Sequence, residues 1–289
     1  MYKYQNICIR WNDKISTPFG AKNGIRQGSV LSPFMFGLYM NDLSYILNAS
    51  QVGCLVGEQL VNHLMYADDI VLFCPSHFDL QKLINLCGQY GMKHDIIFNV
   101  NKTKCMCFRA SKYKNFEFPK FKLHDGVIDY VNSYKYLGHI VSNINDKEDM
   151  DRQINFIYAR GSTLIRNFDK CSQLVKVILF RSFICNVYCS HLWYNYTQRS
   201  LSSVVTAYTN IFRRFFHLPR YADGTVYSAT AMLHDLGLPT AREIIATNAT
   251  SLYRRIRTST NTILVAFVDS DLFDRSVIRR SWVSNEYCT

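Results

Sequence analysis

Two adjacent carboxylates, Asp68 and Asp69, stand between two short apolar runs. The runs, Leu64–Tyr66 and Ile70–Phe73, have the length and the aromatic and β-branched content of buried strands. The bend between them therefore predicts a tight β-hairpin with an acidic tip. If the flanking strands are buried, holding two negative charges between them costs free energy unless a cation binds there. Mg²⁺ is the natural candidate, because it prefers oxygen ligands such as carboxylates. A solvated turn is the alternative, because aspartate is common in turns.

A glycine-containing loop upstream of this pair is a second candidate for binding chemistry. Gly24 and Gly28 allow the backbone to approach a ligand closely. Ser32 is a candidate N-cap and Pro33 a candidate first residue of a helix over residues 33–48. A loop that leads into a helix N-terminus suits phosphate. The same glycine spacing also occurs in an ordinary strand–loop–helix connection, which is the interpretation we favour for the spacing alone.

The overall charge favours a polyanionic partner. The 289 residues include 33 Lys and Arg against 22 Asp and Glu, which gives a formal net charge of +11. Nucleic acid fits this charge, and an anionic membrane surface fits it equally on charge alone. A hydrophobic content of 48% indicates a globular protein, and the length allows two domains, each with its own core.

The ten cysteines show no regular framework, and the first residues lead into no apolar segment. We therefore expect reduced thiols in an intracellular protein, cytoplasmic and/or nuclear, that is not secreted. Cys185, Cys189 and His191 have metal-like spacing but no fourth ligand nearby, so a packed apolar role is favoured over zinc. The most apolar long window, Leu174–Tyr196, is interrupted by charges and predicts a buried helix rather than a membrane span.

The pattern changes from mixed to helical near residues 141–148, which predicts two subdomains. Before this point, strands are expected at residues 4–11, 15–19, 96–100, 105–108 and 134–141, with a helix that begins at Ser76 and is ended by Gly91. After it, glycine and proline are sparse, and helices are expected at residues 149–169, 172–193, 201–217 and 241–257.

Four blocks in this order resemble the reverse transcriptases of non-LTR (LINE-type) retrotransposons. The blocks are Gly24–Pro33 (GIRQGSVLSP), Tyr66–Asp69 (YADD), Asn99–Lys104 (NVNKTK) and Tyr136–Gly138 (YLG). Arg213–Arg220 (RRFFHLPR) resembles the region that follows the polymerase palm in that family. Viral and LTR-type enzymes, group II intron proteins and telomerase are less similar in the first block.

The resemblance implies an α+β fold and a polymerase with nucleic-acid partners. Residues 1–145 would form part of a right-hand polymerase palm, an antiparallel sheet with helices, and residues 146–289 an all-α region like the thumb or connection. The implied partners are an RNA template, a DNA primer and deoxynucleoside triphosphates, with two Mg²⁺ ions as cofactors and no membrane. The sequence predicts no oligomeric state.

The resemblance also implies site residues. Asp68 and Asp69 would be catalytic metal ligands, because two-metal nucleotidyl transfer uses carboxylates to hold both ions. Arg26, Gln27 and Gly28 would lie against the incoming nucleotide and template base. Lys102 could protonate the pyrophosphate leaving group, or be only a solvated charge. Tyr136, Leu137 and Gly138 would form the primer grip, or an ordinary core strand.

One departure from the family pattern concerns the first catalytic aspartate, which lies upstream of the first block in that family. Asp13 is the one carboxylate before residue 42, and its place in an Asn-Asp-Lys turn makes it a poor candidate. We therefore expect a fragment that lacks this aspartate and the fingers and has little or no activity alone. Two alternatives remain: a non-catalytic nucleic-acid-binding protein derived from such an enzyme, and a fragment that does not fold stably because its sheet exposes edges.

Overall fold

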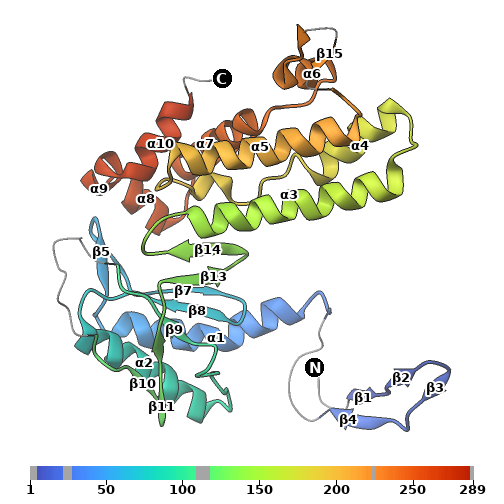
Figure 1. The fold of residues 1–289 in the computed structure, drawn as a ribbon. Helices are drawn as coiled ribbons and strands as arrows, with labels where there is room; N and C mark the ends of the chain where they lie inside the picture. The colour runs from blue at the N-terminus through green and yellow to red at the C-terminus, as the bar shows by residue number, and fades with distance from the viewer. Residues whose placement is uncertain (1–4, 22–27, 109–117, 220, 223–224, 287–289) are drawn as a thin grey trace. The chain divides into compact units, whose positions relative to one another are not determined.

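A computed structural model of the chain describes residues 5–21, 28–108, 118–219, 221–222 and 225–286 (Figure 1). The chain divides into two compact units that alternate along the sequence. The first unit comprises residues 1–55, 60–99 and 119–127, and the second unit comprises residues 56–59, 100–118 and 128–289. Each unit has its own hydrophobic core.

The first unit is built on two helices and a hairpin. Helix α1 spans Ser32–Ala49, helix α2 spans His77–Lys93, and the strands β7 (His63–Tyr66) and β8 (Asp69–Leu72) pair in antiparallel fashion. Each helix contributes one apolar face to a common core, against which partly buried side chains of both strands pack. The buried members are Met40, Leu43 and Leu47 of α1 and Leu83, Cys87 and Tyr90 of α2.

Both helices begin close to the predicted residues. Ser76 is the N-cap of α2 as predicted, and its Oγ accepts a hydrogen bond from the Asp79 N–H. Helix α1 begins one residue earlier than predicted, so Leu31 is its N-cap and Ser32 its first residue. The predicted capping role of Ser32 is therefore wrong. Pro33 does lie in the first turn, where its missing N–H costs nothing.

Gly91 does not end helix α2, as the sequence predicted, but lies inside its last turns. A Cβ on Gly91 would stand 2.6 Å from the Ile96 carbonyl oxygen and 3.1 Å from the Phe98 ring. The chain after the helix folds back over this residue, and the Ile96 N–H donates to the Gly91 carbonyl. This return explains why the predicted strand over residues 96–100 is absent: the segment packs on the helix end instead of pairing with a strand.

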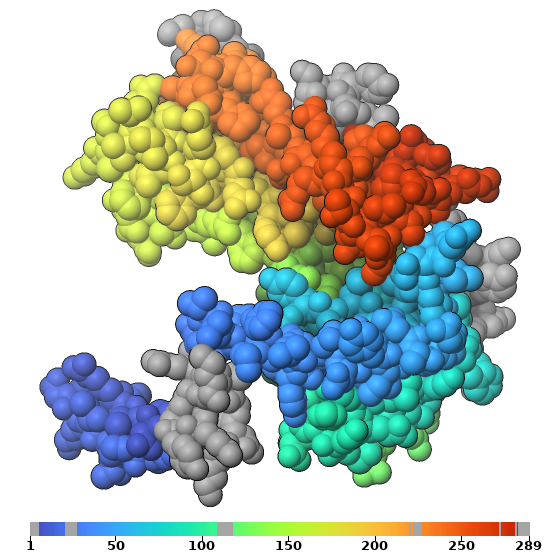
Figure 2. Space-filling model, turned by 180° about the vertical axis from the view of Figure 1, so that it is seen from behind, coloured from blue at the N-terminus to red at the C-terminus, as the bar shows by residue number. Residues whose placement is uncertain are grey.

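One face of α1 remains exposed along the surface of the first unit (blue in Figure 2). Phe34, Leu38 and Tyr45 are 60 to 69% exposed on this helix. The N-terminal hairpin is also largely exposed, with Trp11 at 77%. It contains β1 (Gln5–Ile7) paired with β4 (Phe19–Ala21) and β2 (Arg10–Trp11) paired with β3 (Lys14–Ile15), which confirms the predicted strand–turn–strand pattern.

The other strands of the described chain are short and pair two by two. The pair β9 and β12 is parallel, and the other registers that the structure defines are antiparallel. This mixture of helices and small sheets is compatible with a reverse transcriptase fold. The strands are β5 (Cys54–Val56), β6 (Gln59–Val61), β9 (Lys104–Cys105), β10 (Lys122–Leu123), β11 (Gly126–Val127), β12 (Asp129–Tyr130), β13 (Ser133–Tyr136), β14 (His139–Ser142), β15 (Tyr221–Ala222) and β16 (Thr225–Val226). The strand predicted over residues 105–108 is reduced to Cys105, the last residue of β9.

Helices dominate the second unit. They are α3 (Lys147–Phe168), α4 (Gln173–Phe183), the 3₁₀ turn η1 (Ser190–Leu192), α5 (Gln198–Phe215), α6 (Ala229–Asp235), α7 (Ala241–Arg257), α8 (Thr262–Val268), α9 (Asp271–Arg275) and α10 (Val277–Glu286). Fully buried aromatic side chains of α4 and α5, Phe180, Tyr208, Phe212 and Phe215, form the centre of the core. Gly161 of α3 lets that helix approach α5 closely, because a Cβ there would lie 2.4 Å from Ile211.

The predicted buried helix over residues 172–193 is wrong in two respects. Helix α4 ends at Phe183, and the chain then turns through Cys189, which has a left-handed φ of 58°, into η1. Helix α4 is also only partly buried, since Leu174 is 72% exposed and Ile178 is 56% exposed. Within the described residues, no helix combines the length and apolar character that crossing a membrane requires.

Candidate functional site

The acidic pair lies at the tip of the β7–β8 hairpin, as predicted. Tyr66 pairs with Asp69, so Ala67 and Asp68 form a two-residue loop. Ala67 has a φ of 51°, in the left-handed region that favours glycine. A positive φ at the first position of such a loop follows the right-handed twist of the two strands. Asp68 therefore lies in the loop, and Asp69 follows it as the first residue of β8 at the end of the hairpin.

A buried polar network anchors the base of this hairpin. The Asn62 side chain, 1% exposed, donates from Nδ2 to the carbonyls of Leu47 (2.7 Å) and Val52 (2.9 Å). Its Oδ1 lies 2.6 Å from His63 Nδ1, and His63 Nε2 lies 2.7 Å from Ser44 Oγ. An amide oxygen only accepts, so Nδ1 carries the proton and Nε2 accepts from the serine hydroxyl. Burial lowers the pKa of His63, which keeps the ring neutral.

The two carboxylates are exposed to solvent, which corrects one step of the sequence-based reasoning. The strands on either side are only half-buried, with Leu64 at 41% and Tyr66 at 64% exposed. Two exposed carboxylates carry no desolvation cost that a cation would have to offset. Adjacent carboxylates still suit a divalent cation, but the described residues hold no cluster of three His, Cys, Asp or Glu side chains placed for a metal. The metal-ligand role of Asp68 and Asp69 stays a prediction.

Of the three predicted nucleotide-binding residues, Arg26 and Gln27 lie outside the described residues. Gly28 is described and has a φ of 82°, a backbone conformation that side-chain-bearing residues rarely adopt. A Cβ on Gly28 would meet no atom within 4 Å. The backbone conformation therefore favours glycine here, and the space beside it is open.

Lys102 lies in an exposed turn of the second unit, and its proposed catalytic role remains untested. The Tyr134 hydroxyl stabilises this turn by donating a hydrogen bond to the Lys102 carbonyl at 3.1 Å. The neighbouring Lys104 has a different role, because its Nζ lies 2.6 Å from Asp129 Oδ2 across the β9–β12 pair. Lys104 is thus tied to a carboxylate of the adjacent strand.

The turn of a second hairpin, between β13 and β14, contains Tyr136, Leu137 and Gly138. The sequence predicted one strand over residues 134–141 with a glycine in it, and the structure replaces it with this hairpin. Leu137 has a φ of 46° and Gly138 a φ of 83°. Two successive left-handed residues are the requirement of the tightest hairpin turn, which explains the glycine.

Two groups from the helical part of the second unit hold this hairpin. At its tip, the Tyr188 hydroxyl donates to the Leu137 carbonyl at 2.9 Å. The Tyr188 ring lies so close that a Cβ on Gly138 would stand 3.0 Å from it. Close to the turn, on β14, the N–H of Ile140 donates to the carboxylate of Asp149 at 3.0 Å. Two contacts therefore hold the turn end of this hairpin.

Asp149 is fully buried and is the centre of a charged network that sequence reasoning missed. Trp193 Nε1 donates to its Oδ2 at 2.8 Å, Arg152 Nε donates to its Oδ1 at 3.0 Å, and His139 Nδ1 lies 3.1 Å from Oδ2. Burial alone would raise the pKa of this carboxyl. The interactions with His139, the Ile140 N–H, Trp193 and Arg152 outweigh burial and hold the pKa well below its usual range.

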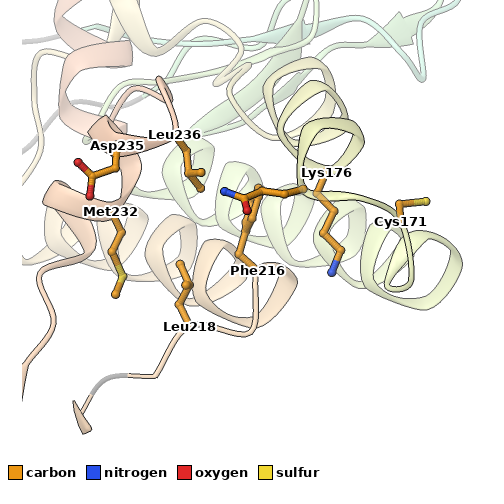
Figure 3. A pocket seen from close by; sticks show the side chains of 8 residues that line it. Cys171, Lys176, Phe216, Leu218, Met232, Asp235 and Leu236 are labelled. Carbon is orange, nitrogen blue, oxygen red and sulfur yellow. The ribbon is translucent and has the colours of Figure 1, made fainter. Parts of the chain in front are cut away.

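A cavity of 410 Å³ in the second unit contains none of the predicted site residues (Figure 3). It is lined by Cys171, Gln173, Lys176, Phe216, Leu218, Met232, Asp235 and Leu236. The buried Lys176 ammonium donates to the Phe215 carbonyl at 2.9 Å and lies 3.7 Å from Asp169. These contacts give Lys176 a structural role at the end of α5.

The similarity to known proteins covers slightly less than half of the chain. Residues 2–141 match the family described as reverse transcriptase (RNA-dependent DNA polymerase). A retrovirus-related Pol polyprotein from the type-2 retrotransposable element R2DM of Drosophila melanogaster is 32% identical over 136 residues, which are 43% of this chain and 12% of that protein. A polyprotein from the type-1 element R2 of Popillia japonica is 26% identical over 144 residues, 47% of this chain and 23% of its own length. The matched segments thus span less than a quarter of either relative.

Proposed function

Residues 2–141 carry a reverse transcriptase domain of the non-LTR retrotransposon type, and on this premise we propose that the chain is part of an RNA-directed DNA polymerase. The observation that carries the proposal is the acidic hairpin inside the matched segment, with Asp68 and Asp69 at its tip. The network around Asn62 and His63 supports it, because a catalytic pair needs a rigid base.

The two parts of the chain would have different roles in the polymerase. Residues 1–145 would act as part of the palm and residues 146–289 as a thumb-like or connecting region. The helical character of the second half supports this division. An RNA template, a DNA primer and deoxynucleoside triphosphates would be the partners.

The chemistry would be nucleotidyl transfer at the acidic hairpin. Mg²⁺, when bound, would lower the pKa of the primer 3′-hydroxyl and stabilise the attacking and leaving oxygens. The carboxylates of Asp68 and Asp69 would hold it, and Gly28 would leave room beside the nucleotide. Lys102 would donate a proton to the departing pyrophosphate. The turn Tyr136–Gly138 would support the primer end, with Tyr188 and Asp149 fixing its position.

The 289-residue polypeptide, purified as such, would show little or no DNA synthesis. The resemblance implies a third metal-binding carboxylate on an upstream strand. Asp13 does not fill that role, because it lies in the turn of the exposed β2–β3 hairpin. Stabilisation by bound metal ions is worth several kcal/mol, and each ~1.4 kcal/mol is a factor of ten in rate.

Metal binding and synthesis should be measured on the same preparation. We expect Mn²⁺, used as a paramagnetic substitute for Mg²⁺, to broaden NMR signals of the β7–β8 hairpin, and the double variant Asp68→Asn/Asp69→Asn to abolish this broadening. Asp125→Asn, which removes an acidic side chain from the exposed turn of the β10–β11 hairpin, is the matched control and should leave it intact. Equal broadening in all three proteins would contradict the metal role, and efficient primer extension by the polypeptide alone would contradict the expected inactivity.

A non-catalytic nucleic-acid-binding role is the second candidate, favoured by the net charge of +11. It predicts salt-dependent binding of primer–template duplex. The two candidates differ when the polypeptide is supplied with a polymerase segment that carries the upstream aspartate. Restored templated synthesis supports the enzyme, and binding without synthesis supports the second role.

A further inference from the structure

A shallow cleft of 340 Å³ runs along helix α7, outside residues 2–141 that match the reverse transcriptase family. Its lining residues follow one another at helical spacing and therefore share one face of the helix. Each of them ends in a hydroxyl or a guanidinium group: Thr247, Thr250, Ser251, Arg254 and Arg255. The cleft thus offers hydrogen-bond donors and positive charge, without an apolar or acidic lining residue.

No carboxylate among the described residues forms an ion pair with the two arginines of the cleft, Arg254 and Arg255. The sequence contains no Asp or Glu from residue 244 to residue 268. The one carboxylate of α7, Glu243, lies at the opposite end of the helix, where it caps the N-terminus together with Thr240 and contacts His234.

The neighbouring histidine responds to this charge. The pKa of His191 is lowered by burial first, and then by the positive charges of His139 and Arg255. Arg255 is therefore close enough to η1 to act electrostatically on His191. An anion in the cleft would relieve this repulsion.

Thr250 is an independent sign of an unfilled site. The residue is 7% exposed, and its Oγ1 has no hydrogen-bond partner within the described part of the chain. A buried hydroxyl without a partner is destabilising, and native proteins hold few of them. Thr250 lines the cleft beside two guanidinium groups. A rotation about its χ1 would turn the hydroxyl, which is buried in this conformation, towards an oxyanion bound there.

We infer that this cleft binds phosphate groups of a nucleic-acid backbone. Guanidinium forks and hydroxyls are the groups that bind phosphate oxygens, and Arg254 and Arg255 lie one turn from Ser251 and Thr250. No aromatic side chain lines the cleft to stack on a base, so its chemistry suits a backbone rather than a nucleoside. A membrane surface would require exposed apolar residues beside the charges, and the lining contains none. The identity of the partner, but not the anion-binding chemistry, rests on the proposed function.

The test compares two double variants that remove the same charge. Arg254→Gln/Arg255→Gln alters the cleft, whereas Arg199→Gln/Arg242→Gln removes two other exposed arginines of the second unit. Binding of a fluorescent RNA–DNA duplex is followed by anisotropy over a range of salt concentrations. We expect the cleft variant to bind at least tenfold more weakly and to lower the slope of log affinity against log salt by about 2, because each phosphate contact contributes about 0.9. The control variant should change affinity less than threefold.

A third variant separates binding from folding. Thr250→Val keeps the shape of the side chain and removes the unpartnered hydroxyl, so the melting temperature should stay equal or rise while duplex affinity falls about threefold. Equal affinities of the cleft and control double variants would overturn the inference, as would tighter binding of phosphatidylserine vesicles than of duplex. Neither result would change the outcome of the metal-binding test on Asp68 and Asp69. Failure of this inference can therefore be distinguished from failure of the proposed function.

Discussion

Replacement of Asp149 by alanine is expected to lower the free energy of unfolding of the second unit by about 3–5 kcal/mol, the range for breaking a buried ion pair by removal of one partner. The variant leaves Arg152 and the Trp193 indole N–H without their buried acceptor. It also removes the acceptor of the Ile140 N–H beside the turn of the β13–β14 hairpin. Urea unfolding followed by the fluorescence of the buried tryptophans Trp193 and Trp282 measures the loss.

Asp151→Ala is the matched control, because Asp151 lies half a turn further along α3, is exposed and pairs with the exposed Lys147. An exposed pair of this kind contributes roughly 0.5 kcal/mol. The folded-state pKa of Asp149 lies below that of an unfolded carboxyl, so its contribution is fully present above about pH 4 and is lost as pH falls further. The difference between wild type and Asp149→Asn should therefore shrink below pH 4. A difference that grows in acid would contradict this account.

Gly161→Ala should destabilise the second unit by about 2 kcal/mol, because overpacking outweighs the gain in helix propensity. The new methyl group would lie 2.4 Å from Ile211 Cγ2 and 2.6 Å from its Cδ1, and Ile211 is fully buried. Helix α3 must then move away from α5. Thermal unfolding followed by circular dichroism measures the effect.

Gly37→Ala in α1 makes the same chemical change where no atom lies within 4 Å of the new methyl group. It should stabilise its helix by about 0.5–1 kcal/mol. The double variant Gly161→Ala/Ile211→Ala adds a second check. If the clash is the cause, the double variant loses less stability than the sum of the two single variants. Additive losses would show that Gly161 matters for another reason.

Local signals predicted the elements that depend on local contacts. The helix predicted over residues 241–257 coincides with α7, where Thr240 and Glu243 form a capping box. The acidic hairpin was placed correctly because two apolar runs flank Asp68 and Asp69. The exposure of these carboxylates was not predicted, since it depends on how α1 and α2 cover the strands and not on the strands themselves.

Long-range contacts account for what the sequence did not predict. Asp149 looks like an ordinary acidic residue in the first turn of a helix, and one of its partners, Trp193, is 44 residues away. Gly91 lies inside helix α2 rather than at its end, and the close approach of Ile96 explains why this position is a glycine. The network of Asn62, His63 and Ser44 likewise has no sequence signature, because its members come from separate elements.

Because Trp11 lies on the exposed N-terminal hairpin, the emission of the buried tryptophans can be measured separately from that of Trp11. The chain has three tryptophans. Trp193 and Trp282 are buried in the second unit, and Trp11, the one tryptophan of the first unit, stands on the hairpin at 77% exposure, away from the α1–α2 core. A quencher such as acrylamide will therefore remove the Trp11 signal selectively. The blue-shifted emission that remains reports the second unit alone, and melting of the α1–α2 core, which carries the acidic hairpin, will be silent in it.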